Sequence, residues 1–149
     1  MRPRITYSKY ERRRLGNKSG EFAKIAAMFR RSFGSGTFAG FWRYWNPLFS
    51  YYLLYNCYSP LRKYLPRYIA VMLTFMASGA IHDLFASLAL LKLSVFFTPI
   101  FAGLGSLTIL EEVSGLNFEW ASYPLRYFIN GALITGVFYL GISIGSLSG

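Results

Sequence analysis

Long apolar runs occupy the later part of the chain, whereas its first thirty residues contain none. The apolar runs cover residues 68–91, 93–110 and 127–147. An α-helix rises about 1.5 Å per residue, so roughly 20 apolar residues cross a hydrocarbon core of about 30 Å. This pattern predicts an all-α integral membrane protein with about three transmembrane helices. The middle run is slightly short and contains Pro99, Gly103 and Gly105, so the number of full crossings is open by one.

The pattern divides the chain into two parts. Residues 1–36 form a basic N-terminal arm, and residues 37–149 form a membrane domain. Within the arm, Phe22, Ile25 and Phe29 recur at helical spacing between residues 21 and 31. This spacing predicts a short amphipathic helix lying on a membrane surface. The alternative is a solvated tail without fixed structure.

Aromatic residues are dense between the arm and the first apolar run, in residues 37–67. Tryptophan and tyrosine rings of this kind are enriched at the level of the lipid headgroups. Arg43, Asn46 and Pro47 interrupt the stretch, and polar backbone at membrane depth is tolerated only inside protein. We therefore predict an interfacial or re-entrant helix here rather than a full span.

Composition supports lipid as the environment and gives the arm an orientation. Of the residues, 54% are hydrophobic and only 15% charged, against roughly a quarter charged in soluble domains. The net charge is +10, and ten of the sixteen lysines and arginines lie between Arg2 and Arg31. Because basic residues flank apolar spans, the positive-inside pattern explains them better than nucleic-acid binding does. We expect no nucleic-acid partner and a cytoplasmic N-terminus, while the membrane itself stays undetermined.

The arm also suggests a lipid partner. The rest of the chain offers little that indicates cofactor or redox chemistry. The cluster Arg12, Arg13 and Arg14 is suited to anionic lipid headgroups. No apolar signal-peptide core precedes Arg31, so we expect the N-terminus to stay on the side of synthesis. Cys57 is the single cysteine, and no Cys/His cluster has metal-ligand spacing, so no metal site is expected.

The only histidine, His82, lies with Asp83 inside the first apolar run. Ionisable groups at membrane depth are costly and usually face a protein interior or a wet cavity. Ser78 precedes His82 by one turn on the same helical face, where it can hydrogen-bond or line the same cavity. Asp83 points about 100° away and is expected to meet another helix or the far interface. The alternative for His82 is a hydrogen-bonded structural residue.

Three motifs in order carry a resemblance to a known family. Residues 41–46 read FWRYWN, residues 58–62 read YSPLR, and residues 78–82 place Ser-Gly before His82. This ordered set resembles the membrane-bound O-acyltransferase family, over roughly residues 38–85. The order of three motifs is more specific than any one of them alone.

The resemblance implies roles for particular residues. His82 would be the catalytic histidine, taking a proton from an acceptor hydroxyl. Asn46 would be its polar partner, orienting the acyl donor or steadying the developing oxyanion. Trp42, Trp45, Ser78 and Arg43 are the candidate substrate-binding residues. The co-substrate would be a thioester, an acyl-CoA or an acyl-carrier conjugate, with no resident cofactor.

Two other functions compete with acyl transfer. Members of this family are longer and build their chamber from more helices, so we expect partner subunits in the membrane. The first alternative is therefore a non-catalytic accessory subunit of a larger membrane complex derived from this family. A channel or transporter component, using His82 and Asp83, is the last alternative.

Overall fold

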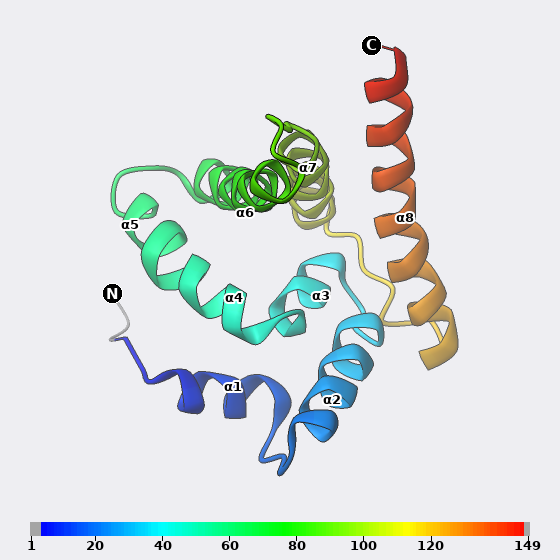
Figure 1. The fold of residues 1–149 in the computed structure, drawn as a ribbon. Coiled ribbons are helices and arrows are strands. Elements are labelled where there is room, and N and C mark those ends of the chain that lie inside the picture. The colour runs from blue at the N-terminus through cyan, green and yellow to red at the C-terminus, as the bar shows by residue number, and fades with distance from the viewer. Residues whose placement is uncertain (1–3, 148–149) are drawn as a thin grey trace.

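A computed structural model describes residues 4–147 of the chain, with side chains as far as residue 143, and the described residues are helical with no β-strand. The helices are α1 (Tyr7–Leu15), α2 (Glu21–Phe33), α3 (Phe38–Tyr44), α4 (Pro47–Leu53), the π-helical turn η1 (Leu54–Tyr58), α5 (Ser59–Leu61), α6 (Arg67–Leu90), α7 (Phe97–Ser114) and α8 (Tyr123–Leu147). Figure 1 shows α1 and α2 as a layer on one side of the molecule, with α3 and α4 between this layer and the α6–α7 pair.

Helix α1 was not predicted, because its sequence is almost wholly polar and basic. Tertiary contacts hold it: Tyr10 and Leu15 are buried against the body. The hydroxyl of Tyr51 donates to the carbonyl of Ile5 at 2.8 Å, and the Arg31 guanidinium donates to the carbonyl of Arg14 at 2.7 Å. Helix α1 is thus folded onto α2 and α4.

The predicted amphipathic helix is present as α2, and it runs two residues further than its pattern indicated. Its end is held by α8, because the fully buried Asn130 amide donates to the carbonyls of Phe33 at 2.8 Å and Ser35 at 3.0 Å. The carbonyls at a helix C-terminus lack partners within the helix, so this amide supplies them.

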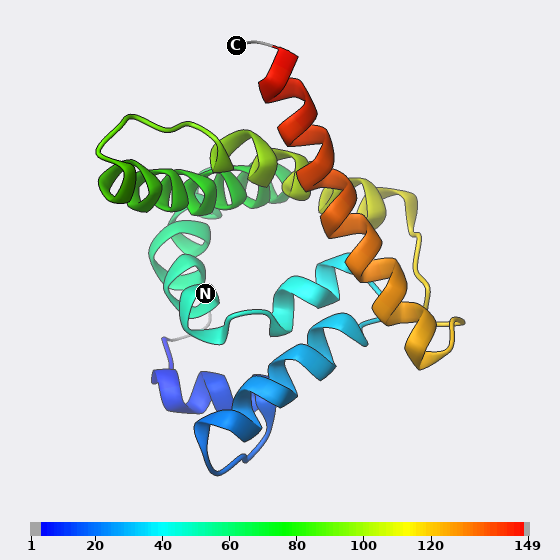
Figure 2. The ribbon, with the colours of Figure 1, turned by 45° about the vertical axis from the view of Figure 1, so that its right-hand side comes forward.

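Helices α6 and α7 form a close antiparallel pair, which Figure 2 shows lengthwise. A Cβ atom added to Gly79 would lie 2.7 Å from the Cα of Thr98, and one at Gly105 would lie 3.0 Å from the Cβ of Phe75. Glycine is required at Gly79 because the backbone of α7 lies where a side chain would begin. One helix, Arg67–Leu90, covers the predicted first span, 68–91, and its ends differ from the predicted bounds by one residue each.

Asp83 meets another helix, as its helical phase predicted. Its carboxylate accepts the backbone N–H groups of Phe96 at 2.7 Å, Phe97 at 2.6 Å and Thr98 at 2.8 Å. The hydroxyl of Thr98 donates to the same carboxylate at 2.6 Å. These N–H groups are the ones left without partners at a helix N-terminus, so Asp83 fixes the start of α7.

The second apolar run was placed four residues too early and ended too soon. Helix α7 covers Phe97–Ser114 rather than 93–110, because Asp83 caps it at residue 96. Pro99 falls in the first turn of α7. The N–H groups of a first turn have no partner within the helix, so the N–H that proline lacks is not missed and Pro99 does not interrupt the helix. Glu111 and Glu112 follow the predicted end of the run and belong to α7, where Glu111 accepts the N–H groups of Phe38 and Ala39 and Glu112 pairs with Arg67.

Two helices, not three, are long and apolar enough to cross a membrane within the described residues: Arg67–Leu90 and Tyr123–Ser143. Helix α7, which includes Glu111 and Glu112, is not one of them, so the described residues have one candidate span fewer than three, the difference that the sequence left open. The last apolar run is confirmed as α8, but it begins four residues earlier than predicted, at Tyr123.

Among the glycines of α8 whose surroundings are described, Gly141 allows a close contact with another helix. A Cβ on Gly141 would lie 2.5 Å from the Ile100 side chain, whereas Gly131 and Gly136 have no such neighbour within 4 Å. Gly145 lies outside the residues whose packing is described. Helix α8 therefore approaches α7 closely at Gly141, and its residue Val137 also packs against α7 beside Gly103.

The core lies where α3 meets α7, and a buried glutamate sets that contact. Phe38, Phe41, Ile100 and Leu104 form the buried cluster. The Glu111 carboxylate accepts the N–H groups of Phe38 at 2.6 Å and Ala39 at 3.0 Å, which caps α3 from α7. Burying a carboxylate is costly unless hydrogen bonds compensate it, and these two bonds supply that compensation.

Candidate functional site

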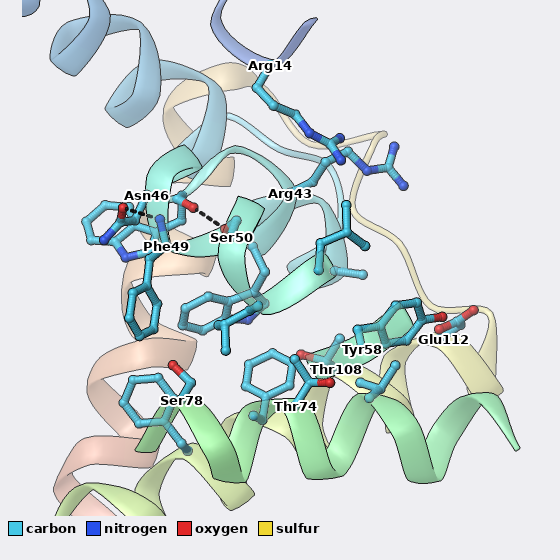
Figure 3. A pocket seen from close by; sticks show the side chains of 18 of the residues that line it. Arg14, Arg43, Asn46, Phe49, Ser50, Tyr58, Thr74, Ser78, Thr108 and Glu112 are labelled. Carbon is cyan, nitrogen blue, oxygen red and sulfur yellow. Dashed lines mark hydrogen bonds between the residues drawn. The ribbon is translucent and has the colours of Figure 1, made fainter. Parts of the chain in front are cut away.

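A cavity of about 390 Å³ lies between α6 on one side and α3, α4 and η1 on the other. Its lining residues include Tyr10, Arg14, Trp42, Arg43, Trp45, Asn46, Phe49, Ser50, Tyr58, Arg67, Val71, Thr74, Phe75, Ser78, His82, Phe101, Thr108 and Glu112. Figure 3 shows side chains from α6 pointing into it from below and those of Asn46, Phe49 and Ser50 from above.

All six residues singled out from the sequence line this one cavity. They are His82, Asn46, Trp42, Trp45, Ser78 and Arg43. Arg62, from the second sequence motif, does not line it, and its guanidinium donates instead to the carbonyl of Leu65 at 2.6 Å. The structure thus brings the first and third motifs together across the cavity, while their chemical roles are a separate question.

His82 is held in one orientation by its neighbours. Its Nδ1 lies 2.7 Å from the backbone carbonyl of Ser78. A carbonyl oxygen can only accept, so Nδ1 carries the hydrogen and Nε2 is the unprotonated nitrogen of the neutral ring. Among the described residues, Nε2 has no hydrogen-bond partner. The Phe101 ring packs beside the imidazole with centroids 4.9 Å apart.

Ser78 therefore contributes to this arrangement through its backbone rather than its hydroxyl. The residue is buried, and Figure 3 shows its hydroxyl directed into the cavity. In a helix the carbonyl four residues earlier is already bonded to a backbone N–H, so the His82 ring shares an acceptor within its own helix. The serine hydroxyl is left to face whatever occupies the cavity.

Asn46 starts α4 in an uncommon backbone conformation. Its φ is 40° and ψ 74°, in the left-handed region that asparagine tolerates better than most residues. Its side-chain oxygen accepts the N–H of Phe49 at 3.1 Å and so caps α4. With that oxygen engaged, the amide N–H groups of Asn46 are the part of the side chain that is left to bind something else. They have no partner among the described residues.

Trp42 and Trp45 stand in an aromatic cluster beside the cavity. Trp42 packs against the Phe41 and Phe75 rings at 5.0 and 5.3 Å, and Trp45 packs against Phe29 at 5.3 Å. The indole N–H of Trp42 is buried without a hydrogen-bond partner in the part of the chain that is described. A buried donor left unpaired costs free energy, so a ligand in the cavity that accepts from it would gain by doing so.

One end of the cavity is charged and the other is apolar. Figure 3 places the guanidinium groups of Arg14 and Arg43 together above the carboxylate of Glu112 and the hydroxyl of Tyr58. Glu112 is paired with Arg67 at 2.5 Å, and among the described residues neither Arg14 nor Arg43 has a carboxylate partner. Ser78 lies toward the opposite end, where phenylalanine rings surround His82. The cavity thus suits a molecule with an anionic end and an apolar end.

Several lining residues were missed by sequence reasoning, for two different reasons. Arg67, Val71 and Thr74 share the face of α6 that carries Ser78 and His82, so helical spacing alone could have found them. Tyr10 and Arg14 line the cavity only because α1 folds back over α4. No local pattern signals that contact.

Taken together, the chain is a helical membrane protein with a cavity that ends on a histidine of an apolar helix. Residues 15–111 match the MBOAT, membrane-bound O-acyltransferase family, and this match covers well over half of the chain. The chain belongs to that family, whose members are embedded in membranes. The match includes α6 and nearly all of α7, and it excludes α8. No curated protein matches the chain, and no solved structure matches it.

Proposed function

We propose that this chain transfers an acyl group from a thioester donor to a hydroxyl acceptor, with His82 as the general base. The observation that carries the proposal is the bond from His82 Nδ1 to the carbonyl of Ser78 at 2.7 Å, because it leaves Nε2 as the basic nitrogen at a cavity wall. Membership of the acyltransferase family supports the same reaction class.

The chemistry needs one proton acceptor and no covalent intermediate. Nε2 of His82 takes the proton of the acceptor hydroxyl as its oxygen attacks the thioester carbonyl. The carbon–sulfur bond then breaks, and the thiolate leaves with the proton that His82 gives back. The products are an ester and a free thiol. A direct transfer of this kind requires donor and acceptor to occupy the cavity at the same time.

Two donors on the opposite wall are suited to the charge that develops on the carbonyl oxygen. The amide N–H groups of Asn46 are unengaged while its oxygen caps α4. The indole N–H of Trp42 is buried and unpaired among the described residues. Donors that are fixed before the reaction lower the barrier most, because they need no reorganisation as charge appears.

The charged end of the cavity indicates how the donor is placed. Arg14 and Arg43 would meet an anionic part of the donor, and the apolar end beside Phe49 and Phe101 would take the acyl chain. Trp45 would form part of the wall. We expect this charged end to face the cytoplasm, since the basic arm supplies Arg14. Partner subunits in the membrane would close the open sides of the cavity.

A second candidate function is a non-catalytic subunit of a larger membrane complex. One observation favours it: both proposed reacting residues already have structural bonds, His82 to Ser78 and Asn46 to Phe49. A third, channel-like function loses one of its two ionisable groups, because Asp83 is fully engaged in capping α7.

The deciding experiment compares His82→Asn with His82→Gln in the purified, reconstituted chain. Asparagine can keep a donor near the Nδ1 position and preserve the bond to Ser78, while both variants lack the base. Acyl-CoA thioesters of several chain lengths, mixed with hydroxyl acceptors, are followed by free-thiol release and by mass spectrometry of the ester. We expect transfer by the unchanged chain and a loss of about 100-fold or more in both variants. Full transfer by His82→Asn would remove His82 from the base role.

A further inference from the structure

Helix α2 presents an apolar face that the other described residues leave exposed. Phe22, Ile25 and Phe29 follow one another at helical spacing, and they are 85%, 50% and 43% exposed. Lys24 and Arg31 turn the opposite way, toward Glu11 and the carbonyl of Arg14 on α1. One side of α2 is therefore fixed to α1 while the apolar side faces away from it.

The direction of that apolar face follows from its inner end. The Phe29 ring stacks on Phe33 at 6.0 Å and meets Trp45 edge-on at 5.3 Å. Trp45 ends α3, which lies on the side of α2 toward the apolar helices (Figure 2). The face formed by Phe22, Ile25 and Phe29 thus turns the same way as the membrane part of the molecule.

Helix α2 also ends where a candidate span begins. The hydroxyl of Tyr123, the first residue of α8, donates to the carbonyl of Arg30 at 2.7 Å. Figure 1 shows α8 rising away from α2, with its C-terminal end far from the α1–α2 layer. Because an apolar span starts at the headgroup level, the end of α2 lies at that level too.

Exposed cations lie on α1, the helix to which the polar side of α2 is fixed. Arg12 and Arg13 on α1 are exposed, and their guanidinium groups have no partner among the residues that the structure describes. Over the described residues 4–33 there are nine lysines and arginines and two glutamates. The two glutamates are occupied by Lys24, so the surface around them is strongly positive.

We propose that α2 lies in the surface of an anionic lipid bilayer, with Phe22, Ile25 and Phe29 inserted among the acyl chains and Arg12 and Arg13 on anionic headgroups. The combination of an apolar helix face with neighbouring cations is what binds helices to such surfaces. A protein partner would need acidic groups to match the arginines and is the competing occupant. The inference is independent of the acyl-transfer reaction.

The first part of the test measures which side of α2 touches lipid. Phe22→Cys, Ile25→Cys and Glu21→Cys are made in a Cys57→Ser background and labelled with an environment-sensitive fluorophore. Glu21 is the control because its side chain is 83% exposed and its carboxylate pairs with Lys24 on the polar side of α2, whereas Phe22 is 85% exposed on the apolar face. The full chain is reconstituted in vesicles that contain lipids with a nitroxide quencher at a shallow acyl position. We expect strong quenching at 22 and 25 and weak quenching at 21.

The second part measures lipid charge. Quenching of the label at position 22 by a nitroxide-bearing anionic lipid is compared with that by a neutral one, in Arg12→Gln/Arg13→Gln and in Lys92→Gln. Lys92 is the control because it is an exposed cation that follows the C-terminal end of α6 and is not part of α1 or α2. We expect the preference for anionic lipid to fall in the arginine variant, by at most about fivefold for each charge removed, and to stay in the lysine variant.

Two outcomes would overturn the proposal. Equal, weak quenching at 21, 22 and 25 would mean that water or a protein covers this face. An unchanged lipid preference in the arginine variant would mean that Arg12 and Arg13 do not bind headgroups. Size-exclusion profiles that match the unchanged chain show that each variant is folded, so neither outcome can be ascribed to unfolding.

Discussion

The ring of Phe49 packs edge-on against the imidazole of His82, with ring centroids 5.5 Å apart. The backbone N–H of the same phenylalanine donates to Asn46 at 3.1 Å. One residue at the start of α4 therefore touches both proposed reacting groups, which come from different helices. The first turn of α4 sets how Asn46 and His82 stand relative to each other. This arrangement allows the role of Asn46 as a cap to be separated from its role as a donor.

Asn46→Asp should keep the fold and lose the activity. Aspartate caps helices as well as asparagine does, so the free energy of unfolding should change by no more than about 0.5 kcal/mol. Its carboxylate has no N–H to offer and would repel a developing oxyanion, so kcat should fall about 100-fold or more. Unfolding midpoints and thiol release on the same preparation measure the two effects.

Asn46→Gly is the control for the backbone. Glycine adopts the left-handed φ of 40° without strain and costs little as a cap, yet it also lacks the amide. It should therefore lose activity as Asn46→Asp does. If Asn46→Asp stays active while Asn46→Gly does not, Asn46 acts through the helix start and not through its N–H groups.

Trp42→Phe should separate binding from stability. The indole N–H of Trp42 has no partner among the described residues, so removing it breaks no internal bond, and stability should fall by no more than about 1 kcal/mol. If a substrate accepts from this N–H, kcat/KM should fall about tenfold. Kinetics at several donor concentrations make the comparison.

Trp45→Phe is the matched control. Trp45 lines the same cavity, but its indole N–H, unlike that of Trp42, is not a buried donor without a partner among the described residues. Its kcat/KM should change less than that of Trp42→Phe. Equal losses in both variants would point to lost ring volume instead of a lost donor.

The elements that the sequence predicted well are those that local pattern determines. The apolar run that gave α6 needs no partner to be recognised, and the spacing within it put Ser78 and His82 on one face. Helix α1 was missed because burial of Tyr10 and Leu15 stabilises it, and that burial depends on α4. The bounds of α7 were missed because its start depends on Asp83 and its end on the partners of Glu111, all distant in sequence.

The candidate site also contains residues that local sequence could identify and residues that only the fold brings in. Motif order indicated that Asn46 and His82 belong together, and the fold places both at one cavity. Arg14 is absent from every motif, yet it shares the charged end of the cavity with Arg43. Its position is a product of the folded arm, so local sequence carried no signal for it.

The α6–α7 pair should be sensitive to two small substitutions. Asp83→Asn replaces one carboxylate oxygen by an N–H₂ group that faces N–H donors, and loss of charge-assisted bonds should cost about 2 kcal/mol. Gly79→Ala places a methyl group against the Thr98 backbone and should cost about 1–3 kcal/mol. Thermal unfolding in detergent measures both.

Gly131→Ala provides the control for these two substitutions. It has no neighbour within 4 Å of the added methyl group, so within this chain nothing opposes the substitution. Its midpoint should stay at or above that of the unchanged chain, because alanine is the better helix former. If Gly79→Ala were equally neutral, the close approach of α6 and α7 would be wrong.

The docking of α1 should weaken at alkaline pH through Tyr7. Burial, together with the bond its hydroxyl donates to Glu11 at 2.8 Å, raises the pKa of Tyr7 from 10.0 to about 12. The folded chain thus holds this proton more tightly than the unfolded chain does. The resulting stability is complete below pH 10 and is lost progressively as the pH rises from 10 toward 12.

Tyr7→Phe should remove this part of the pH dependence, although it also loses the bond to Glu11. Unfolding midpoints of both proteins between pH 8 and 12 give the difference directly, which cancels the titration of the other tyrosines and the lysines. Parallel curves for the two proteins would show that the Tyr7 hydroxyl is not held in a buried bond to Glu11.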